Sequence, residues 1–178
     1  MRIIAGEFRS RRLKSLPGAA TRPTPDRLRE TLFDILQTRI AGATFADAYA
    51  GTGAVGLEAL SRGARHAWFL ERRRPALQLI RANLAELSLE SRATVLAGPV
   101  LHTLAQQSAE IVFLDPPYDQ DREYRSALDL LGATPPELVI AQHSIRLELP
   151  EAVGSLKRTR QVRQGDNQLT FYAGRSGV

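Results

Sequence analysis

The stretch Phe45-Ala46-Asp47-Ala48-Tyr49-Ala50-Gly51-Thr52-Gly53-Ala54-Val55-Gly56 decides the fold of this chain. Its first five residues predict a buried strand, and its glycines fit the G-x-G-x-x-G pattern of a tight turn that opens a helix. Glu71 lies 20 residues after Gly51, at the end of a second predicted strand. This spacing is typical of nucleotide sites, where small residues let a ligand approach the backbone and the acid binds a ribose diol.

Predicted strands and helices alternate from residue 44 onward. The strands are predicted at 45–49, 66–71, 93–97, 110–114 and 137–141, and the helices at 54–63, 75–88, 99–107 and 122–131. Such alternation is typical of α/β domains with a doubly wound, mostly parallel sheet and helices on both faces. After residue 155 two extended segments, 157–162 and 168–173, are joined by Gln164-Gly165-Asp166-Asn167, which indicates a hairpin.

The N-terminal part has a different pattern. Residues 2–13 predict a short strand pair that turns near Gly6 or Ser10, and residues 15–23 predict a loop. A helix is expected to begin with Thr24 as N-cap and Pro25 at the first helical position, and to run to about Ile40. The sequence therefore predicts a basic arm or hairpin over residues 1–23, followed by one globular domain over residues 24–178.

The positive charge is concentrated at the two ends of the chain. Residues 1–29 carry a net +6, residues 30–154 a net −5 and residues 155–178 a net +4, within the total of +5. Basic ends beside an acidic middle are expected for a protein that binds a polyanion such as nucleic acid, although a solvated arginine-rich surface gives the same pattern. The candidate nucleic-acid contacts at the first end are Arg9, Arg11, Arg12 and Lys14.

The composition excludes several classes of protein. The chain has no cysteine, which excludes disulfides and thiolate metal sites, and its three histidines are too scattered for metal ligands, so no metal is expected. No apolar run approaches the about 18 residues of a membrane-spanning helix, and the N-terminus lacks the apolar stretch of a signal peptide. A cytoplasmic protein is expected.

The tetrapeptide Asp115-Pro116-Pro117-Tyr118 follows the predicted strand at 110–114. The carboxylate can accept a hydrogen bond from a planar NH2 group, the prolines contribute only carbonyl acceptors, and the ring offers a face for a nucleobase. The tetrapeptide could therefore hold an exocyclic amine and direct its nitrogen at an electrophile. A proline-rich turn after a strand is the plainer interpretation. The nearby acids Asp119, Asp121 and Glu123 are expected to be solvated.

Two features favour S-adenosylmethionine over a nicotinamide dinucleotide in the glycine turn. Asp47 precedes the glycines, where a cationic amino group could be held, and Asp115 opens into the same crevice at the carboxyl ends of the strands. A dehydrogenase has no evident use for the tetrapeptide. Gly56 is interpreted as a structural residue that lets a helix pack closely.

With these residues identified, the chain resembles a known family. Asp47-x-x-x-Gly51-x-Gly53 resembles the first motif of class I S-adenosylmethionine-dependent methyltransferases, and the tetrapeptide resembles the fourth motif of their amino-methylating branch. Residues 1–7, together with Arg22-Pro-Thr-Pro-Asp26-Arg-Leu-Arg-Glu30-Thr-Leu-Phe33, are similar to the RsmD family. Its members methylate the N2 amine of one guanine in bacterial 16S rRNA, which makes the rRNA or the small ribosomal subunit the expected partner.

The resemblance implies a Rossmann-like fold with a seven-stranded sheet, in a monomer. It places Asp47, Tyr49, Gly51 and Gly53 beside the cofactor, Glu71 on the ribose, and Arg22 and Thr24 over the cofactor cleft. It makes all four residues, Asp115, Pro116, Pro117 and Tyr118, catalytic, with Asp115 accepting from the guanine amine and Tyr118 stacking on the base.

Two departures from the family pattern concern the ends of the third and fifth strands. Where many relatives carry an acid or amide for adenine, this chain has Gly98-Pro99, so adenine recognition is expected from backbone groups such as the Val100 N–H. After the fifth strand, where relatives often carry an acid, the sequence has Gln142-His143.

Other functions remain open at this point. The same chemistry could act on adenine N6 or cytosine N4, in RNA or DNA, because the tetrapeptide alone does not separate these amines. A non-catalytic RNA-binding factor for ribosome assembly would keep the fold, although the intact Asp115 and glycines argue against it.

Overall fold

Residues 45–56 form most of the central strand β1, the glycine turn after it and the start of helix α2. The computed structural model describes residues 1–15, 25–117 and 121–174. All five residues of β1 are buried, as expected for a strand covered on both faces. The helices are α1 (Asp26–Ile35), α2 (Ala54–Ser61), α3 (Arg74–Glu86), η1 (Glu90–Arg92, a 3-10 helix), α4 (Val100–Leu104) and α5 (Asp121–Ala133). The strands are β1 (Thr44–Ala48), β2 (His66–Glu71), β3 (Ala93–Ala97), β4 (Ile111–Leu114), β5 (Leu138–Ser144), β6 (Ala152–Val153), β7 (Leu156–Gln164) and β8 (Asn167–Gly174).

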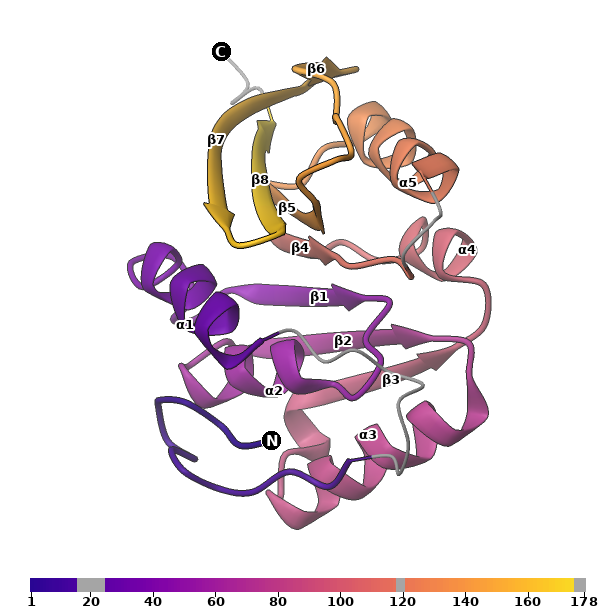
Figure 1. The fold of residues 1–178 in the computed structure, drawn as a ribbon. Helices are drawn as coiled ribbons and strands as arrows, with labels where there is room; N and C mark the ends of the chain where they lie inside the picture. The colour runs from indigo at the N-terminus through magenta and orange to yellow at the C-terminus, as the bar shows by residue number, and fades with distance from the viewer. Residues whose placement is uncertain (16–24, 118–120, 175–178) are drawn as a thin grey trace.

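One sheet in the order β3-β2-β1-β4-β5-β8-β7-β6 joins these strands (Figure 1). The first five are parallel, and β8, β7 and β6 pair antiparallel with their neighbours. The predicted α/β doubly wound fold is therefore confirmed. The sheet has one strand more than the expected seven, because the two-residue strand β6 pairs with the start of β7.

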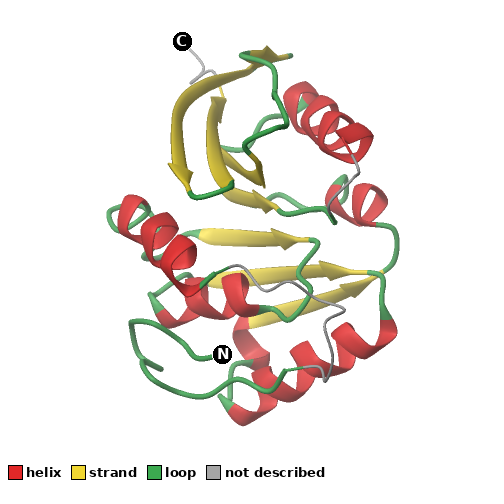
Figure 2. Cartoon of the chain, viewed as in Figure 1, coloured by secondary structure: helices red, strands yellow, loops and turns green. Residues whose placement is uncertain are grey.

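Helices lie on both faces of the sheet (Figure 2), and the sheet separates two clusters of buried apolar residues. Phe45 of β1 packs with residues of α1, α2 and α3, whereas Ala46 and Ala48 pack with residues of α4 and α5. After β1 the chain passes to the α2 layer, and after β4 it passes to the α5 layer. Because the chain leaves these adjacent strands in opposite directions, a crevice is expected at their carboxyl ends.

The first fifteen residues pack on the α2 and α3 side of the sheet. Ile3 and Leu13 are buried in the core, and the side chain of Glu58 accepts hydrogen bonds from the N–H groups of Ile4 and Ala5 at 2.8 and 2.9 Å. The expected strand pair is reduced to a single antiparallel bridge between Arg2 and Arg12. The N-terminal segment is thus held both by backbone hydrogen bonds between its two arms and by side chains of the core.

The structure corrects the predicted bounds of two elements. Helix α1 ends at Ile35, and a turn then carries the buried Ile40 to the core, so the prediction of a helix to Ile40 was wrong. Pro25 is the N-cap, and Thr24 lies outside the described residues. Gln142 and His143 lie inside β5 instead of after it, because β8 pairs with β5 as far as Ser144.

His143 is a packed residue of this strand. It is buried, its Nδ1 lies 2.9 Å from the Ser144 carbonyl oxygen and its Nε2 lies 2.8 Å from the Thr170 hydroxyl oxygen. Within the described ranges no group of three or more His, Cys, Asp or Glu residues could hold a metal ion. Nor does this part of the chain include a helix long and apolar enough to span a membrane.

Candidate active site at the carboxyl edge of the sheet

Three predicted site residues meet where β1, β2 and β4 end. Ala48 lies opposite Leu70 of β2 and Leu114 of β4, so the next residues along each strand, Tyr49, Glu71 and Asp115, occupy neighbouring positions at one edge. The parallel register alone brings together residues that are 22 and 44 positions apart in the chain. This carboxyl edge is the place where doubly wound sheets bind ligands.

The glycine turn leaves this edge with an unusual backbone. Tyr49, Gly51 and Gly53 have positive φ angles of 67°, 54° and 77°, and the Gly53 N–H donates to the Ala50 carbonyl at 2.7 Å. A Cβ added to Gly51 would meet only the Tyr49 carbonyl oxygen among the described residues, at 3.9 Å. The backbone at Gly51 is therefore open, which is the condition for the close ligand approach that the glycine pattern predicts.

A glycine is needed at position 56 for a different reason, which is close packing. A Cβ on it would collide with the ring of Phe69 on β2, so this glycine allows α2 to pack closely on the sheet. The expectation that Gly56 is structural fits this contact.

Asp47 lies under the glycine turn. The residue is 2% exposed, and its Oδ2 accepts a hydrogen bond from the Gly56 N–H at 2.8 Å. Burial raises the pKa of Asp47 well above its ordinary value, against the lowering effect of the Gly56 N–H, and the charges of Asp115 and Glu71 raise it further. The carboxylate therefore holds the start of α2, and a cation placed nearby would relieve its electrostatic cost.

Glu71 connects the turn to the end of β2. Its Oε2 accepts from the Gly51 N–H at 2.9 Å, and its Oε1 accepts from the N–H groups of Arg72 and Arg73 at 2.9 Å each. The Arg73 side chain also lies 3.4 Å from Oε1. This buried carboxylate is fixed by three backbone donors, two of them on Oε1, so its remaining acceptor capacity lies on Oε2.

Asp115 begins the catalytic tetrapeptide predicted from the sequence. It is half-buried, and its N–H lies 3.4 Å from the Ala48 carbonyl oxygen, which continues the pairing of β4 with β1. Pro116 is buried and Pro117 is exposed. Tyr118, predicted to stack on the base, lies outside the described residues, as do Arg22 and Thr24.

The structure adds Glu123 to the residues near this edge, although the sequence did not indicate it as a site residue. The Tyr49 hydroxyl donates to Oε1 of Glu123 at 2.9 Å, in the first turn of α5. Burial raises the pKa of Tyr49 above its ordinary value, and the Glu123 carboxylate adds to the effect. Glu123 is thus not only a solvated acid: it ties the end of β1 to the helix that follows the tetrapeptide. No sequence signal links two residues 74 positions apart.

The predicted adenine-binding residues lie at the end of β3. Gly98 has a φ of 144°, and its N–H donates to the Glu71 carbonyl at 3.2 Å, which keeps this turn beside β2. Val100 is buried and begins α4, after Pro99 as N-cap. Both residues therefore lie at the same edge of the sheet as Glu71, where the sequence placed them.

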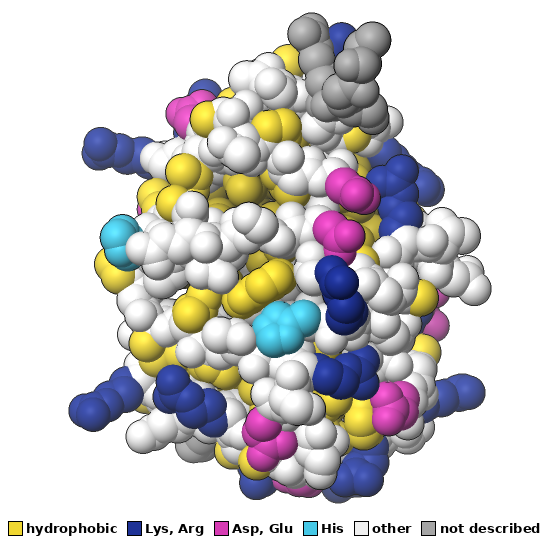
Figure 3. All heavy atoms as spheres, turned by 180° about the vertical axis from the view of Figure 1, so that it is seen from behind, with side chains coloured by type: hydrophobic (Ala, Val, Ile, Leu, Met, Phe, Trp, Pro, Cys, Tyr) yellow, Lys and Arg dark blue, Asp and Glu magenta, His cyan; other side chains and the backbone are white. Residues whose placement is uncertain are grey.

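The basic residues of the N-terminal segment lie apart from this edge. Arg9, Arg11 and Arg12 are exposed, whereas the Lys14 ammonium lies 3.2 Å from Glu86 of α3. On the face seen from behind, Lys and Arg side chains are interspersed with acidic ones and do not form one continuous patch (Figure 3). Of the four predicted nucleic-acid contacts, Lys14 already has an acidic partner.

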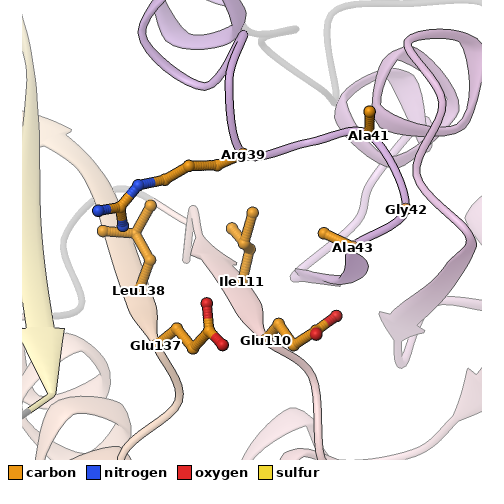
Figure 4. A pocket seen from close by; sticks show the side chains of 8 residues that line it. All are labelled: Arg39, Ala41, Gly42, Ala43, Glu110, Ile111, Glu137 and Leu138. Carbon is orange, nitrogen blue, oxygen red and sulfur yellow. The ribbon is translucent and has the colours of Figure 1, made fainter. Parts of the chain in front are cut away.

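A hollow of about 240 Å³ lies at the opposite, amino edge of the sheet (Figure 4). Ile111 and Leu138 form part of its wall, and Arg39, Glu110 and Glu137 are its charged residues. Glu110 accepts from the N–H and hydroxyl of Thr44 at 2.6 and 2.9 Å, and these bonds lower its pKa. The hollow contains none of the predicted site residues, and its best acceptor is already used within the fold.

Comparison with known proteins identifies the family to which this site belongs. The sequence matches the family model described as "Conserved hypothetical protein 95" over residues 1–173. A protein of Bacillus subtilis (strain 168), named "Putative rRNA methyltransferase YlbH", is 35% identical over 181 residues, which cover 97% of this chain and 98% of that protein. The chain belongs to the RsmD family of class I methyltransferases.

A second relative and a solved structure support the same family assignment. "Ribosomal RNA small subunit methyltransferase D" of Escherichia coli (strain K12) is 43% identical over 120 residues, which cover 66% of this chain and 60% of that protein. The solved structure "Putative methyltransferase yhhF from Escherichia coli" superposes with a TM-score of 0.86 at 32% identity, over 98% of this chain and 97% of that one. The RsmD-family resemblance seen in the sequence is therefore confirmed, and the fold agrees along nearly the whole chain.

Proposed function

We propose that this chain transfers a methyl group from S-adenosylmethionine to the exocyclic N2 amine of a guanine in bacterial 16S rRNA, with the small ribosomal subunit as substrate. The observation that carries the proposal is the convergence of Glu71, Asp115 and the glycine turn at one sheet edge, in a chain of the RsmD family. The E. coli relative is named as a small-subunit rRNA methyltransferase. A cytoplasmic monomer that methylates rRNA follows as part of this proposal.

The residues at the edge fit the proposed donor. Gly51 offers open backbone, and Oε2 of Glu71, which accepts one backbone N–H, has acceptor capacity left for a ribose hydroxyl. Asp47 provides a buried negative charge whose cost a cationic amino group would offset. The donor, when bound, supplies a methyl carbon attached to a positively charged sulfur, which makes that carbon electrophilic.

Asp115 would position the acceptor amine. The lone pair of a guanine N2 is delocalised into the ring, so hydrogen bonds from its two protons to Asp115 and the Pro116 carbonyl would make the nitrogen more tetrahedral. A bond then forms between N2 and the methyl carbon while the carbon–sulfur bond breaks and its electron pair stays on sulfur. The methylated nitrogen is then positively charged and gives up one proton easily, to Asp115 or to water, so Asp115 need not be a strong base. Positioning of this kind contributes at most roughly 7–11 kcal/mol to lowering the barrier.

The RNA must present an accessible base. A guanine stacked within a helix cannot reach this edge, so the target is expected in a loop or flipped out of its stack. Arg9, Arg11 and Arg12 would contact the phosphates around it, and binding is expected to weaken with salt.

The test is methyl transfer from radiolabelled S-adenosylmethionine to 16S rRNA, to small subunits that lack their methylations, and to DNA, with the modified nucleoside identified. Label in N2-methylguanosine, lost in Asp115→Ala, is the expected result. Label in methyladenine or methylcytosine would refute the guanine target while keeping the role of Asp115. Donor binding without transfer to any nucleic acid would favour a non-catalytic assembly factor.

A further inference from the structure

Strand β7 is a basic strand near one end of the sheet. Its nine residues include Lys157, Arg158, Arg160 and Arg163 and no acid, and the adjoining strand β8 carries no charged residue at all. These four cations account for the net positive charge of the C-terminal part of the sequence, together with Arg175, which lies outside the described residues. The proposed reaction does not use them.

Only one of these four cations has an acidic partner in the described part of the chain. The Arg158 guanidinium lies 2.7 Å from Glu151 and also donates to the Leu149 carbonyl. Lys157, Arg160 and Arg163 are exposed, and no carboxylate of the described residues lies within ion-pair distance of them. Three cations of β7 are therefore available to an outside anion.

The outer edge of β7 is open along most of its length. Strand β6 pairs only with Leu156 and Lys157, and among the described residues no strand lies beside the rest of β7 (Figure 1). Arg160 lies opposite Phe171 and Arg163 opposite Gln168, which places the two arginines on opposite faces of the strand. The open edge of β7, with its backbone N–H groups, therefore has the Arg160 side chain on one face and the Arg163 side chain on the other.

The hairpin of β7 and β8 turns at the edge where the proposed reaction takes place. Gln164 pairs with Asn167, and Asn167 pairs with Ser144 at the carboxyl end of β5. Because β4 is separated from β7 by β5 and β8, three strand spacings, or roughly 14 Å, lie between the two strands. The N-terminal basic segment packs against α2 and α3, whereas β7 lies near the opposite end of the strand order, so the chain has two separate basic regions.

We propose that Arg160 and Arg163, with the open edge of β7 between them, bind the phosphate backbone of the RNA next to the target base. The inference rests on the proposed rRNA methyltransferase function and deepens it by adding a second, C-terminal contact to the RNA. An edge strand can also carry charges and a bulge simply to prevent edge-to-edge association, and β7 has both. The experiment separates these explanations.

The test compares two double variants with the same change in net charge. R160Q/R163Q removes the proposed contacts, and R39Q/R65Q removes two exposed arginines at the amino edge. Binding to 16S rRNA and to small ribosomal subunits is measured between 50 and 200 mM salt, alongside S-adenosylmethionine affinity and sedimentation. R160Q/R163Q is expected to bind both RNA forms about tenfold or more weakly and to lower the slope of log affinity against log salt by about 1.5. R39Q/R65Q is expected to stay within about twofold of the native chain, and R160K/R163K to recover most of the binding, because lysine keeps the charge.

Three results would overturn the proposal. Equal losses in both double variants would mean that net charge alone attracts the RNA. Native RNA binding by R160Q/R163Q, with self-association in sedimentation, would assign the charges to edge protection. A loss confined to intact subunits, with naked rRNA bound normally, would indicate a ribosomal protein as the partner.

The binding assay does not depend on methyl transfer, so the two proposals can fail separately. Lost RNA binding in R160Q/R163Q without N2-methylguanosine from the native chain would keep this surface and refute the reaction. If the native chain forms N2-methylguanosine and R160Q/R163Q binds RNA normally, the proposed reaction is kept and the proposed RNA contact on β7 is refuted.

Discussion

The two edges of the parallel sheet contain similar parts arranged differently. Each edge has a glutamate that accepts a backbone N–H, Glu71 at the carboxyl edge and Glu110 at the amino edge, and each lies near arginines and a glycine with positive φ. The amino edge has the well-defined hollow, yet Glu110 is the acceptor for a single threonine. At the carboxyl edge, neighbouring strands deliver Tyr49, Glu71 and Asp115 to one place.

This difference shows that side chains converging from several strands indicate a functional site better than a hollow or a single acidic residue does. The chain leaves β1 and β4 toward opposite layers, which opens the carboxyl edge. Four predictions test or sharpen this contrast.

The largest expected effect is that of Asp115→Asn on turnover. The near-isosteric amide removes the charge that orients the acceptor amine, so kcat for methyl transfer is expected to fall about 10²-fold or more. Affinity for S-adenosylmethionine should stay within about threefold, because Asp115 is assigned to the acceptor. A variant that loses donor binding in calorimetry instead would move Asp115 into the donor site.

Glu71→Gln and Glu110→Gln form a matched pair across the two edges. A hydrogen bond to a charged group contributes about 1.5–3 kcal/mol, so loss of the charge on Glu71 is expected to raise the Kd for S-adenosylmethionine about 10- to 100-fold. Glu110→Gln should leave that Kd unchanged and lower only the unfolding midpoint. Equal changes in Kd by calorimetry would remove the distinction between the edges.

Tyr49→Phe tests the link between the end of β1 and α5. Loss of one hydrogen bond of about 1 kcal/mol predicts a roughly fivefold decrease in kcat/KM. Because Glu123 accepts this bond, Glu123→Gln in the Tyr49→Phe background should add little, which a double-mutant cycle measures.

Tyr124→Phe is the control on the same helix. The Tyr124 hydroxyl donates to the buried Gln142 carbonyl at 2.6 Å, so this variant should lose stability and keep its kinetics. Identical kinetic losses in the two tyrosine variants would assign Tyr49 a purely structural role.

The smallest expected effect is a gain in stability from Asp47→Asn in the ligand-free protein. The pKa of Asp47 is raised in the folded state, so the folded protein binds this proton more tightly than the unfolded chain. The aspartate therefore lowers stability progressively as pH rises above about 4, the range of an unfolded aspartate. Asp47→Asn should melt higher at neutral pH, by about 2–4 °C for each kcal/mol gained, and match the native chain near pH 3.

The same variant should bind the donor more weakly, since asparagine has no charge for a cationic amino group. Melting curves across pH with and without S-adenosylmethionine test both statements. A midpoint that stays below that of the native chain at neutral pH would mean that the Gly56 hydrogen bond needs the carboxylate.

Local pattern predicted most of the fold. The strands at 66–71 and 93–97 form as predicted, because apolar runs between turn residues have few other ways to be buried. The local sequence pattern failed to predict strand bounds that depend on the neighbouring strand in the sheet. β5 extends through Gln142 and His143 because β8 supplies partners there, and β6 forms only because β7 lies beside it.

For the site, the sequence by itself determined which chemical groups are present and in what order. The glycine turn, Glu71 and Asp115 were found from residue type and spacing, because a turn with positive φ and an acid at a strand end are local requirements. The strand order implied by the pattern also predicted that Asp115 opens into the crevice of the glycine turn, but the tertiary structure decided the exact neighbours. Parallel pairing put Glu71 and Asp115 beside Tyr49, packing brought Glu123 to its hydroxyl, and the sheet order left the edge of β7 open. These contacts join residues far apart in the chain, and their geometry is set by the register and packing of whole strands and helices, which no local stretch of sequence encodes.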